Sequence, residues 1–225
     1  MRLPDLALNA WFPQADDVKV TVSVLPKGPY ASPLVDVVYL SKLVSLLEPQ
    51  AALELGSYRG HVALAIASHM PDDSRLVTVD IIPEHGEAYK GADVSRRIER
   101  RVGAIDDAMF AGEQGAYDLI FIDADHAYES VKHDTGVALP LLRPDGVMVW
   151  HDYANWGAFS KWNGVPEFLV ELAEQLPVVH LAGTNMAVHR PAWARQERAD
   201  LDGILATTQR WQADGAWESE VPPRV

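Results

Sequence analysis

The stretch "AALELGSYRGHVALAIASHM", residues 51–70, begins with a short apolar run, passes through a turn with two glycines and continues as an apolar segment of helical length. Further apolar runs of strand length follow at 75–81, 117–123 and 146–150, and helical stretches separate them. This alternation predicts an α/β protein with a doubly wound, mostly parallel sheet that helices cover on both faces. A helix over residues 32–49 is expected to precede the first strand.

The last apolar runs differ from the earlier ones because almost no chain separates them. In "PVVHLAGTNMAVHR", residues 177–190, two short runs flank Gly183, and this pattern predicts a hairpin with an antiparallel last strand. The chain therefore divides into an N-terminal segment 1–31, serving as a lid or an oligomer contact, a domain 32–190 and a C-terminal tail 191–225. The tail contains Trp193, Trp211 and Trp217, which are expected to pack either on the domain or on a second subunit.

The composition limits the classes of partner. A formal net charge of -13 disfavours binding to nucleic acid or to an anionic membrane surface. The one dense basic cluster, "RRIERR" at 96–101, has helical spacing and is interpreted as a solvated helix face. The absence of cysteine excludes disulfides, thiolate nucleophiles and cysteine-ligated metals. The first residues show neither a signal peptide nor a membrane span, so the expectation is a cytoplasmic enzyme with a small-molecule substrate, and a homo-oligomer stays open.

The glycine turn after the first strand is a candidate ligand site, because open parallel sheets bind ligands at the carboxyl ends of their strands. A dinucleotide fingerprint would need a glycine at Tyr58, and the sequence instead has E-x-G-x-x-x-G, from Glu54 through Gly56 to Gly60. Asp80 ends the next strand, where its carboxylate can accept hydrogen bonds from both hydroxyls of a ribose. The pattern indicates a nucleoside without a pyrophosphate, although the glycines could serve only a tight turn and Asp80 only a cap.

With these residues, the chain resembles the class I S-adenosylmethionine-dependent methyltransferases over roughly residues 32–190. The resemblance implies their Rossmann-like fold and S-adenosylmethionine as the cofactor. The cofactor-binding residues that it implies are Glu54, Gly56, Ser57 and Gly60 around the methionine part, Asp80 on the ribose, Ala104 within "RVGAIDD" near the adenine, and Asp123 at the cofactor's edge.

Ionisable residues gather where two later strands end. Asp123 closes the strand in "FIDADHAYESVKHD", residues 121–134, and His151 and Asp152 follow the strand in "GVMVWHDY". Two converging carboxylates repel each other unless a cation joins them. The phrase D-x-D-H-x-Y-E-x-V-x-x-D, which begins at Asp123 and includes His126, resembles the bacterial group of macrocin and mycinamicin O-methyltransferases and cephalosporin-hydroxylase-like proteins.

This resemblance implies O-methylation of a hydroxyl on a sugar or another natural product, with a divalent metal, Mg or Mn, at Asp123, His151 and Asp152. It implies His126 as the general base, and a neutral imidazole suits that role near pH 7. Asp125 is expected to cap the next helix. His151 departs from the pattern because magnesium prefers oxygen ligands. Either a softer ion such as manganese binds, or two carboxylates suffice, or His151 is itself a catalytic base and no metal is used.

Other functions stay open at this point. A nucleotide-dependent oxidoreductase is disfavoured by the missing dinucleotide fingerprint, and a non-catalytic S-adenosylmethionine-binding module is disfavoured by the retained acids and histidine. Trp156, Phe159 and Trp162 follow the strand that ends at Trp150, so they could form a substrate pocket wall or could equally pack in the core.

Overall fold

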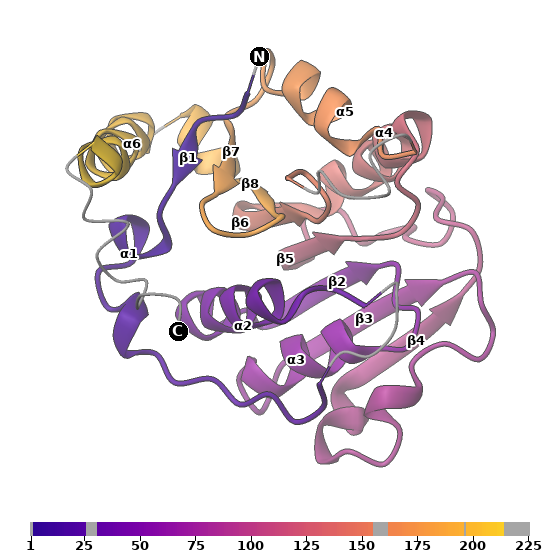
Figure 1. The fold of residues 1–225 in the computed structure, drawn as a ribbon. Coiled ribbons are helices and arrows are strands. Elements are labelled where there is room, and N and C mark those ends of the chain that lie inside the picture. Colours follow the sequence, from indigo (N-terminus) through magenta and orange to yellow (C-terminus); the bar gives the residue numbers. More distant parts are fainter. Residues whose placement is uncertain (1, 26–30, 155–161, 196, 214–225) are drawn as a thin grey trace.

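The computed structural model describes residues 2–25, 31–154, 162–195 and 197–213, which fold around one mixed sheet with helices on both faces (Figure 1). The strands are β1 (Asp5–Leu6), β2 (Ala51–Leu55), β3 (Arg75–Asp80), β4 (Ile98–Val102), β5 (Tyr117–Ile122), β6 (Leu142–Trp150), β7 (Val178–Leu181) and β8 (Ala187–His189). The α-helices are α1 (Leu8–Trp11), α2 (Leu34–Leu47), α3 (His61–His69), α4 (Tyr128–Ala138), α5 (Val165–Leu172) and α6 (Arg198–Ala213).

The strand order across the sheet is β1-β7-β8-β6-β5-β2-β3-β4. Strands β4, β3, β2, β5 and β6 pair in parallel, whereas β8 runs antiparallel to both β6 and β7. The predicted mostly parallel sheet with an antiparallel last strand is confirmed. The order reverses direction at β2 and β5, so the carboxyl ends of these strands border the crevice where such sheets bind ligands.

The central strands are buried on both faces, which explains their nearly continuous apolar sequences. In β2 every residue is buried, and successive side chains point to opposite faces of the sheet. Leu53 and Leu55 pack in the cluster that includes residues of α4 and α5, whereas Ala52 packs in the cluster that includes residues of α2 and α3. The two helical layers therefore hold the strand ends, and the residues just beyond them, at fixed positions.

The interpretation of residues 96–101 as a helix face is wrong. A short 3₁₀-helix ends at Arg97, and β4 follows and pairs in parallel with β3, Ile98 lying opposite Leu76. This strand forms the edge of the sheet, where exposed charges such as those of Glu99 and Arg100 discourage pairing with another chain. The charged side chains are solvated, as expected. Because β4 lies at the edge of the sheet, its sequence lacks the alternating apolar pattern by which a strand is normally identified.

The first and last described segments of the chain pack against each other at one edge of the sheet. Strand β1 pairs with β7, and the backbone N–H of Ala7 donates to the hydroxyl of Thr208 in α6 at 3.0 Å. Trp193 is buried, with its ring centroid 5.0 Å from that of Trp11. The region around Trp193 therefore packs on the domain itself, while Trp217 lies outside the described residues. Among the described helices, none combines the length and the apolar composition that a membrane span requires.

Candidate active site

A cavity of about 1070 Å³ opens at the carboxyl ends of β2, β3, β5 and β6. Its walls include the glycine turn, the residues after β3, the residues after β4, the two acidic strand ends and α4. The lining residues used below are Gly56, Ser57, Tyr58, Asp80, Ile81, Ile82, Ala104, Ile105, Asp123, His126, Asp134, His151 and Asp152. The topology thus brings most of the sequence-predicted site residues to one cavity.

The turn after β2 passes very close to the end of β5. Gly56 has a φ of 91°, and a Cβ atom at this position would lie 2.2 Å from the carbonyl oxygen of Asp123. Only glycine permits both this backbone conformation and this approach. Gly60, by contrast, packs against Tyr89 and does not line the cavity, so its role in the structure is in the turn itself.

Replacing Gly56 with alanine is expected to destabilise the protein by at least about 2 kcal/mol, because the left-handed backbone is strained and the backbone of Asp123 must move. Urea unfolding measures the change. The matched control is Gly136→Ala in α4, where a Cβ atom would meet nothing within 4 Å and the helix gains about 0.5–1 kcal/mol. Equal stabilities of the two variants would contradict the close approach.

Glu54 does not lie where the sequence suggested. Its side chain is fully buried beneath the turn, outside the cavity lining, and the hydroxyl of Thr78 donates a hydrogen bond to it. Burial raises the pKa of Glu54 to about 8, since desolvation penalises the charged form. Glu54 thus lies below the turn, and its Oε1 atom is buried with no hydrogen-bond partner.

Asp80 organises the glycine turn and also faces the cavity. One carboxylate oxygen accepts hydrogen bonds from the backbone N–H groups of Ser57 at 3.1 Å and Tyr58 at 2.7 Å, and the other accepts from Ile82 at 2.9 Å. Each carboxylate oxygen has two lone-pair sites, so the oxygen that accepts only from Ile82 keeps one acceptor site for a ligand hydroxyl. Beyond Asp80, Ile81 and Ile82 line the cavity, with Ala104 and Ile105 from the segment after β4, and this wall is largely apolar.

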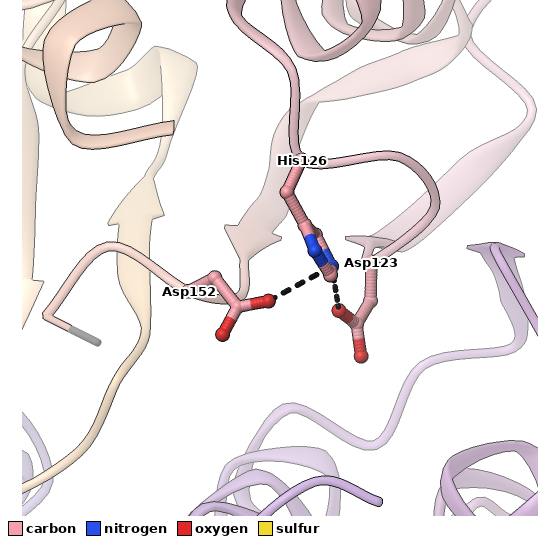
Figure 2. A group of neighbouring side chains, drawn as sticks. All are labelled: Asp123, His126 and Asp152. Carbon is pink, nitrogen blue, oxygen red and sulfur yellow. Dashed lines mark ion pairs between the residues drawn. The ribbon is translucent and has the colours of Figure 1, made fainter. Parts of the chain in front are cut away.

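Asp123, His126 and Asp152 form a tight cluster beyond the ends of β5 and β6, with the imidazole of His126 between the two carboxylates (Figure 2). The Nε2 atom of His126 lies 2.9 Å from Asp152 and 3.6 Å from Asp123. One nitrogen or oxygen atom from each residue lies within 4.8 Å of the others, which is compatible with a shared metal ion. The predicted convergence of the two strand ends is therefore present.

The backbone at Asp152 is itself unusual. Its φ of 60° places a non-glycine residue in the left-handed region, which costs of order 1–2 kcal/mol and persists only when the surroundings enforce it. The side-chain amide of Asn163 donates to the carbonyl oxygen of Asp152 at 2.7 Å and helps to hold this conformation. Strain of this kind concentrates at functional sites, and here it directs the carboxylate toward His126.

The charges in the cluster shift one another's protonation. Hydrogen bonds to Asp123 and Asp152 raise the pKa of His126 to about 10. Burial alone would raise the pKa of Asp123, but the nearby imidazoles of His151 and His126 lower it overall. Both effects have the same cause: two carboxylates in one place favour any positive charge between them.

His151 is buried and lies close to three carboxylates. Its Nε2 atom lies 2.9 Å from the carboxylate of Asp36 in α2, and its Nδ1 atom lies 3.4 Å from both Asp123 and Asp152. Nδ1 is buried and makes no hydrogen bond. Burial opposes a charge on this ring, yet the three carboxylates raise the pKa of His151 well above its usual value.

Two residues of this site were missed by the sequence interpretation. The carboxylate of Asp36 accepts hydrogen bonds from the backbone N–H and the side-chain amide of Asn185, each at 3.0 Å. A signal for Asp36 exists, because it lies on the helix surface that buries Val37 and Leu40, where a polar residue requires a partner. Asn185 lies between β7 and β8 and has no comparable signal.

Acidic residues of the following helix have other roles. Asp125 accepts a hydrogen bond from Ser130 at 2.6 Å and one from the backbone of Ala127 at 3.4 Å, so it holds the start of α4 as expected. Asp134 is buried on the cavity wall, and burial raises its pKa to about 6. Trp156 and Phe159 lie outside the described residues, and Trp162 is 79% exposed without lining the cavity.

Comparison with known proteins places this site in context. Residues 53–153, under half of the chain, match a family model described as a methyltransferase domain. The chain is 32% identical over 117 residues to mouse catechol O-methyltransferase domain-containing protein 1. The aligned region covers 48% of this chain and 44% of that protein. It is 30% identical over 150 residues to tricin synthase 2 of Oryza sativa, covering 63% and 50%. The chain thus spans about half the length of the curated relatives it matches.

Solved structures agree on the fold. An SAH-bound methyltransferase of Podospora anserina superimposes with a TM-score of 0.62 at 21% identity, covering 81% of this chain and 87% of that one. An O-methyltransferase of Bacillus cereus in complex with SAH gives a TM-score of 0.59 at 21% identity, covering 72% and 82%. At such identities the similarity establishes the class I fold. The matched family region contains the glycine turn, Asp80 and the acidic strand ends.

Proposed function

We propose that this protein is an S-adenosylmethionine-dependent O-methyltransferase that acts on a hydroxyl group of a small molecule with the help of a divalent cation. The observation that carries the proposal is the convergence of Asp123, His126 and Asp152 at the edge of a cavity bordered by the glycine turn. The matched methyltransferase-domain model and the names of the relatives support the same reaction class.

The cavity fits the cofactor by the chemistry of its walls. Asp80 offers one remaining acceptor site for a ribose hydroxyl, and Ser57 and the close-packed backbone at Gly56 lie beside it for the amino-acid part. Ile81, Ile82 and Ile105 provide an apolar surface for the adenine ring near Ala104. Glu54 and Gly60 support the glycine turn. Glu54 is buried beneath it and is hydrogen-bonded by Thr78, and Gly60 packs against Tyr89.

The acidic cluster fits a divalent cation because two carboxylates and a buried imidazole nitrogen without a hydrogen bond converge on one place. We assign the ligands as Asp123, Asp152 and His151. A bound cation supplies one element of chemistry here: it lowers the pKa of a hydroxyl group beside it. Its positive charge would also balance the two carboxylates that otherwise hold a proton on His126.

His126 is the residue that we assign as general base. It is the most exposed member of the cluster, with 44% of its side chain accessible, and it faces the cavity. In the proposed reaction the acceptor hydroxyl transfers its proton to the imidazole of His126 while its oxygen forms a bond to the methyl carbon and the carbon–sulfur bond of the sulfonium breaks. The ring of His151 is only 6% exposed and its Nε2 atom is held by Asp36, so the sequence-based alternative of His151 as the base is less suited to the geometry.

The substrate class is proposed from the site and from the relatives together. The names of curated relatives include catechol O-methyltransferase and caffeoyl-CoA O-methyltransferase, so phenolic hydroxyls join the sugar and natural-product hydroxyls suggested by the sequence. The narrower assignment to the macrocin and mycinamicin group stays a prediction, as do a cytoplasmic location and a homo-oligomeric state. Activity assays with labelled S-adenosylmethionine should therefore include catechols, caffeoyl-CoA and hydroxylated sugars.

Cofactor binding is tested by titrating the protein with S-adenosylhomocysteine (SAH) in a calorimeter. Asp80→Ala is expected to weaken binding at least about tenfold, since loss of a hydrogen bond from a ribose hydroxyl to a charged carboxylate costs about 1.5–3 kcal/mol. The matched control is Glu84→Ala, which removes a carboxylate just beyond Asp80 that does not line the cavity. No binding to the wild-type protein, or equal affinity of the Asp80 variant, would contradict the assignment.

A further inference from the structure

Asp36 is a buried residue of α2 that connects His151 of the proposed metal site to Asn185, in the turn between β7 and β8. It is 2% exposed and lies in the first turn of α2, and it bonds His151 after β6 and Asn185 between β7 and β8. The backbone N–H of Tyr153 also donates to the carbonyl oxygen of Asn185 at 2.8 Å, so the segment after β6 is fixed from both sides. His151 therefore has little freedom to rotate.

The hydrogen bonds at Asp36 define which nitrogen of His151 carries a hydrogen. Asn185 offers two N–H donors to Asp36, so this carboxylate acts only as an acceptor. The third contact, with Nε2 of His151 at 2.9 Å, must then be donated by the imidazole. In the neutral ring the lone pair is left on Nδ1, which points toward Asp123 and Asp152.

The distances around Nδ1 fit coordination better than hydrogen bonding. Nδ1 lies 3.4 Å from an oxygen of Asp123 and 3.4 Å from an oxygen of Asp152, and it makes a hydrogen bond to neither. Two ligands that each lie about 2.1 Å from one ion are separated by about 3–3.4 Å at tetrahedral or octahedral angles. His126, in contrast, lies 2.9 Å from the second oxygen of Asp152, a hydrogen-bond distance.

We propose that Asp36 and Asn185 position His151 so that its Nδ1 is the nitrogen ligand of the cation, and that the site therefore prefers a transition metal such as Mn²⁺ to Mg²⁺. The inference rests on the proposed metal-assisted function and adds the positioning residues and the metal preference. A carboxylate that orients a metal-bound histidine fixes the tautomer and strengthens the ligand. Imidazole suits transition metals, whereas Mg²⁺ favours an all-oxygen shell.

The test uses Mn²⁺ alone as the probe, with the full chain and no acceptor. Electron paramagnetic resonance of free Mn²⁺ gives its affinity, and pulsed measurements of the bound ion detect a coupled nitrogen nucleus. The wild-type protein is expected to bind Mn²⁺ at least about tenfold more tightly than Mg²⁺ in competition. Asp36→Asn is expected to weaken Mn²⁺ binding by about 10- to 100-fold.

The matched control is Asp5→Asn, which alters another carboxylate–imidazole pair of the same sheet, that of Asp5 with His180 at 2.7 Å. It is expected to leave Mn²⁺ affinity unchanged, so a loss confined to Asp36→Asn separates positioning from a general loss of stability. Unfolding curves of both variants check that the chain folds. Equal Mn²⁺ affinity of the wild-type and Asp36→Asn proteins would overturn the positioning role.

The nitrogen signal identifies the ligand. It is expected to disappear in His151→Gln and to persist in His126→Gln, and the reverse result would overturn the inference by making His126 the ligand. SAH titration is run in parallel because it reports on the proposed function separately. Binding of SAH without binding of Mn²⁺ defeats only the metal inference, whereas Mn²⁺ coordination by His151 without SAH binding defeats only the methyltransferase assignment.

Discussion

Replacing His126 with glutamine is expected to lower turnover by about 10²- to 10⁴-fold, the usual contribution of a general base. Glutamine retains the polarity and much of the length of the side chain but cannot accept a proton at neutral pH. The imidazole lies at the cavity edge with its Nε2 atom 2.9 Å from Asp152 and 3.6 Å from Asp123. Steady-state kinetics with the best acceptor from the proposed panel measures the effect on kcat.

The specific claim is that His126 acts in the chemical step and not in binding the cofactor. SAH affinity of His126→Gln should therefore stay within about twofold of the wild-type value. His69→Gln is the control for loss of a histidine, since His69 lies on α3 outside the cavity and bonds only backbone groups. Unchanged kcat in His126→Gln would remove His126 from the mechanism.

The sequence predicted the central sheet because each inner strand is buried on both faces and its apolar run is bounded by turns. It failed at the sheet edges for a physical reason. The edge strand β4 is charged and carries little periodic signal, and β1 is two residues long. The tail region was left undecided because the burial of Trp193 depends on Trp11, which is 182 positions away in the sequence.

At the site, too, residues at strand ends were predictable, whereas residues placed by contacts distant in the sequence were not. Asp80, Asp123, His126 and Asp152 were predictable because each follows a strand whose end is fixed by the topology. Glu54 was placed in the cofactor site from its motif, but alternation along β2 directs its side chain into the core. Asp36 lies 115 positions before His151, and no local spacing connects the two.

Removal of divalent cations is expected to lower methyl transfer by about 10³-fold or more while SAH still binds. Several kcal/mol of stabilisation are lost when a metal no longer lowers the pKa of the reacting hydroxyl, and about 4 kcal/mol corresponds to that factor. SAH binding should persist because Asp80 and the backbone of the glycine turn, which we assign to the cofactor, are not ligands of the cation. Dialysis against a chelator, followed by kinetics and calorimetry on the same sample, measures both quantities.

The cation that restores activity after chelation shows whether His151 is a metal ligand or a protonated residue of a metal-free site. If the imidazole is a ligand, Mn²⁺ should restore turnover better than Mg²⁺, because an oxygen-preferring ion gains less from a nitrogen donor. Asp123→Asn and Asp152→Asn should each prevent recovery, whereas Asp145→Asn, an exposed carboxylate in β6, should not. Full activity in excess chelator, with both site variants still turning over, would instead favour a site in which a protonated His151 holds the two carboxylates together and no metal takes part.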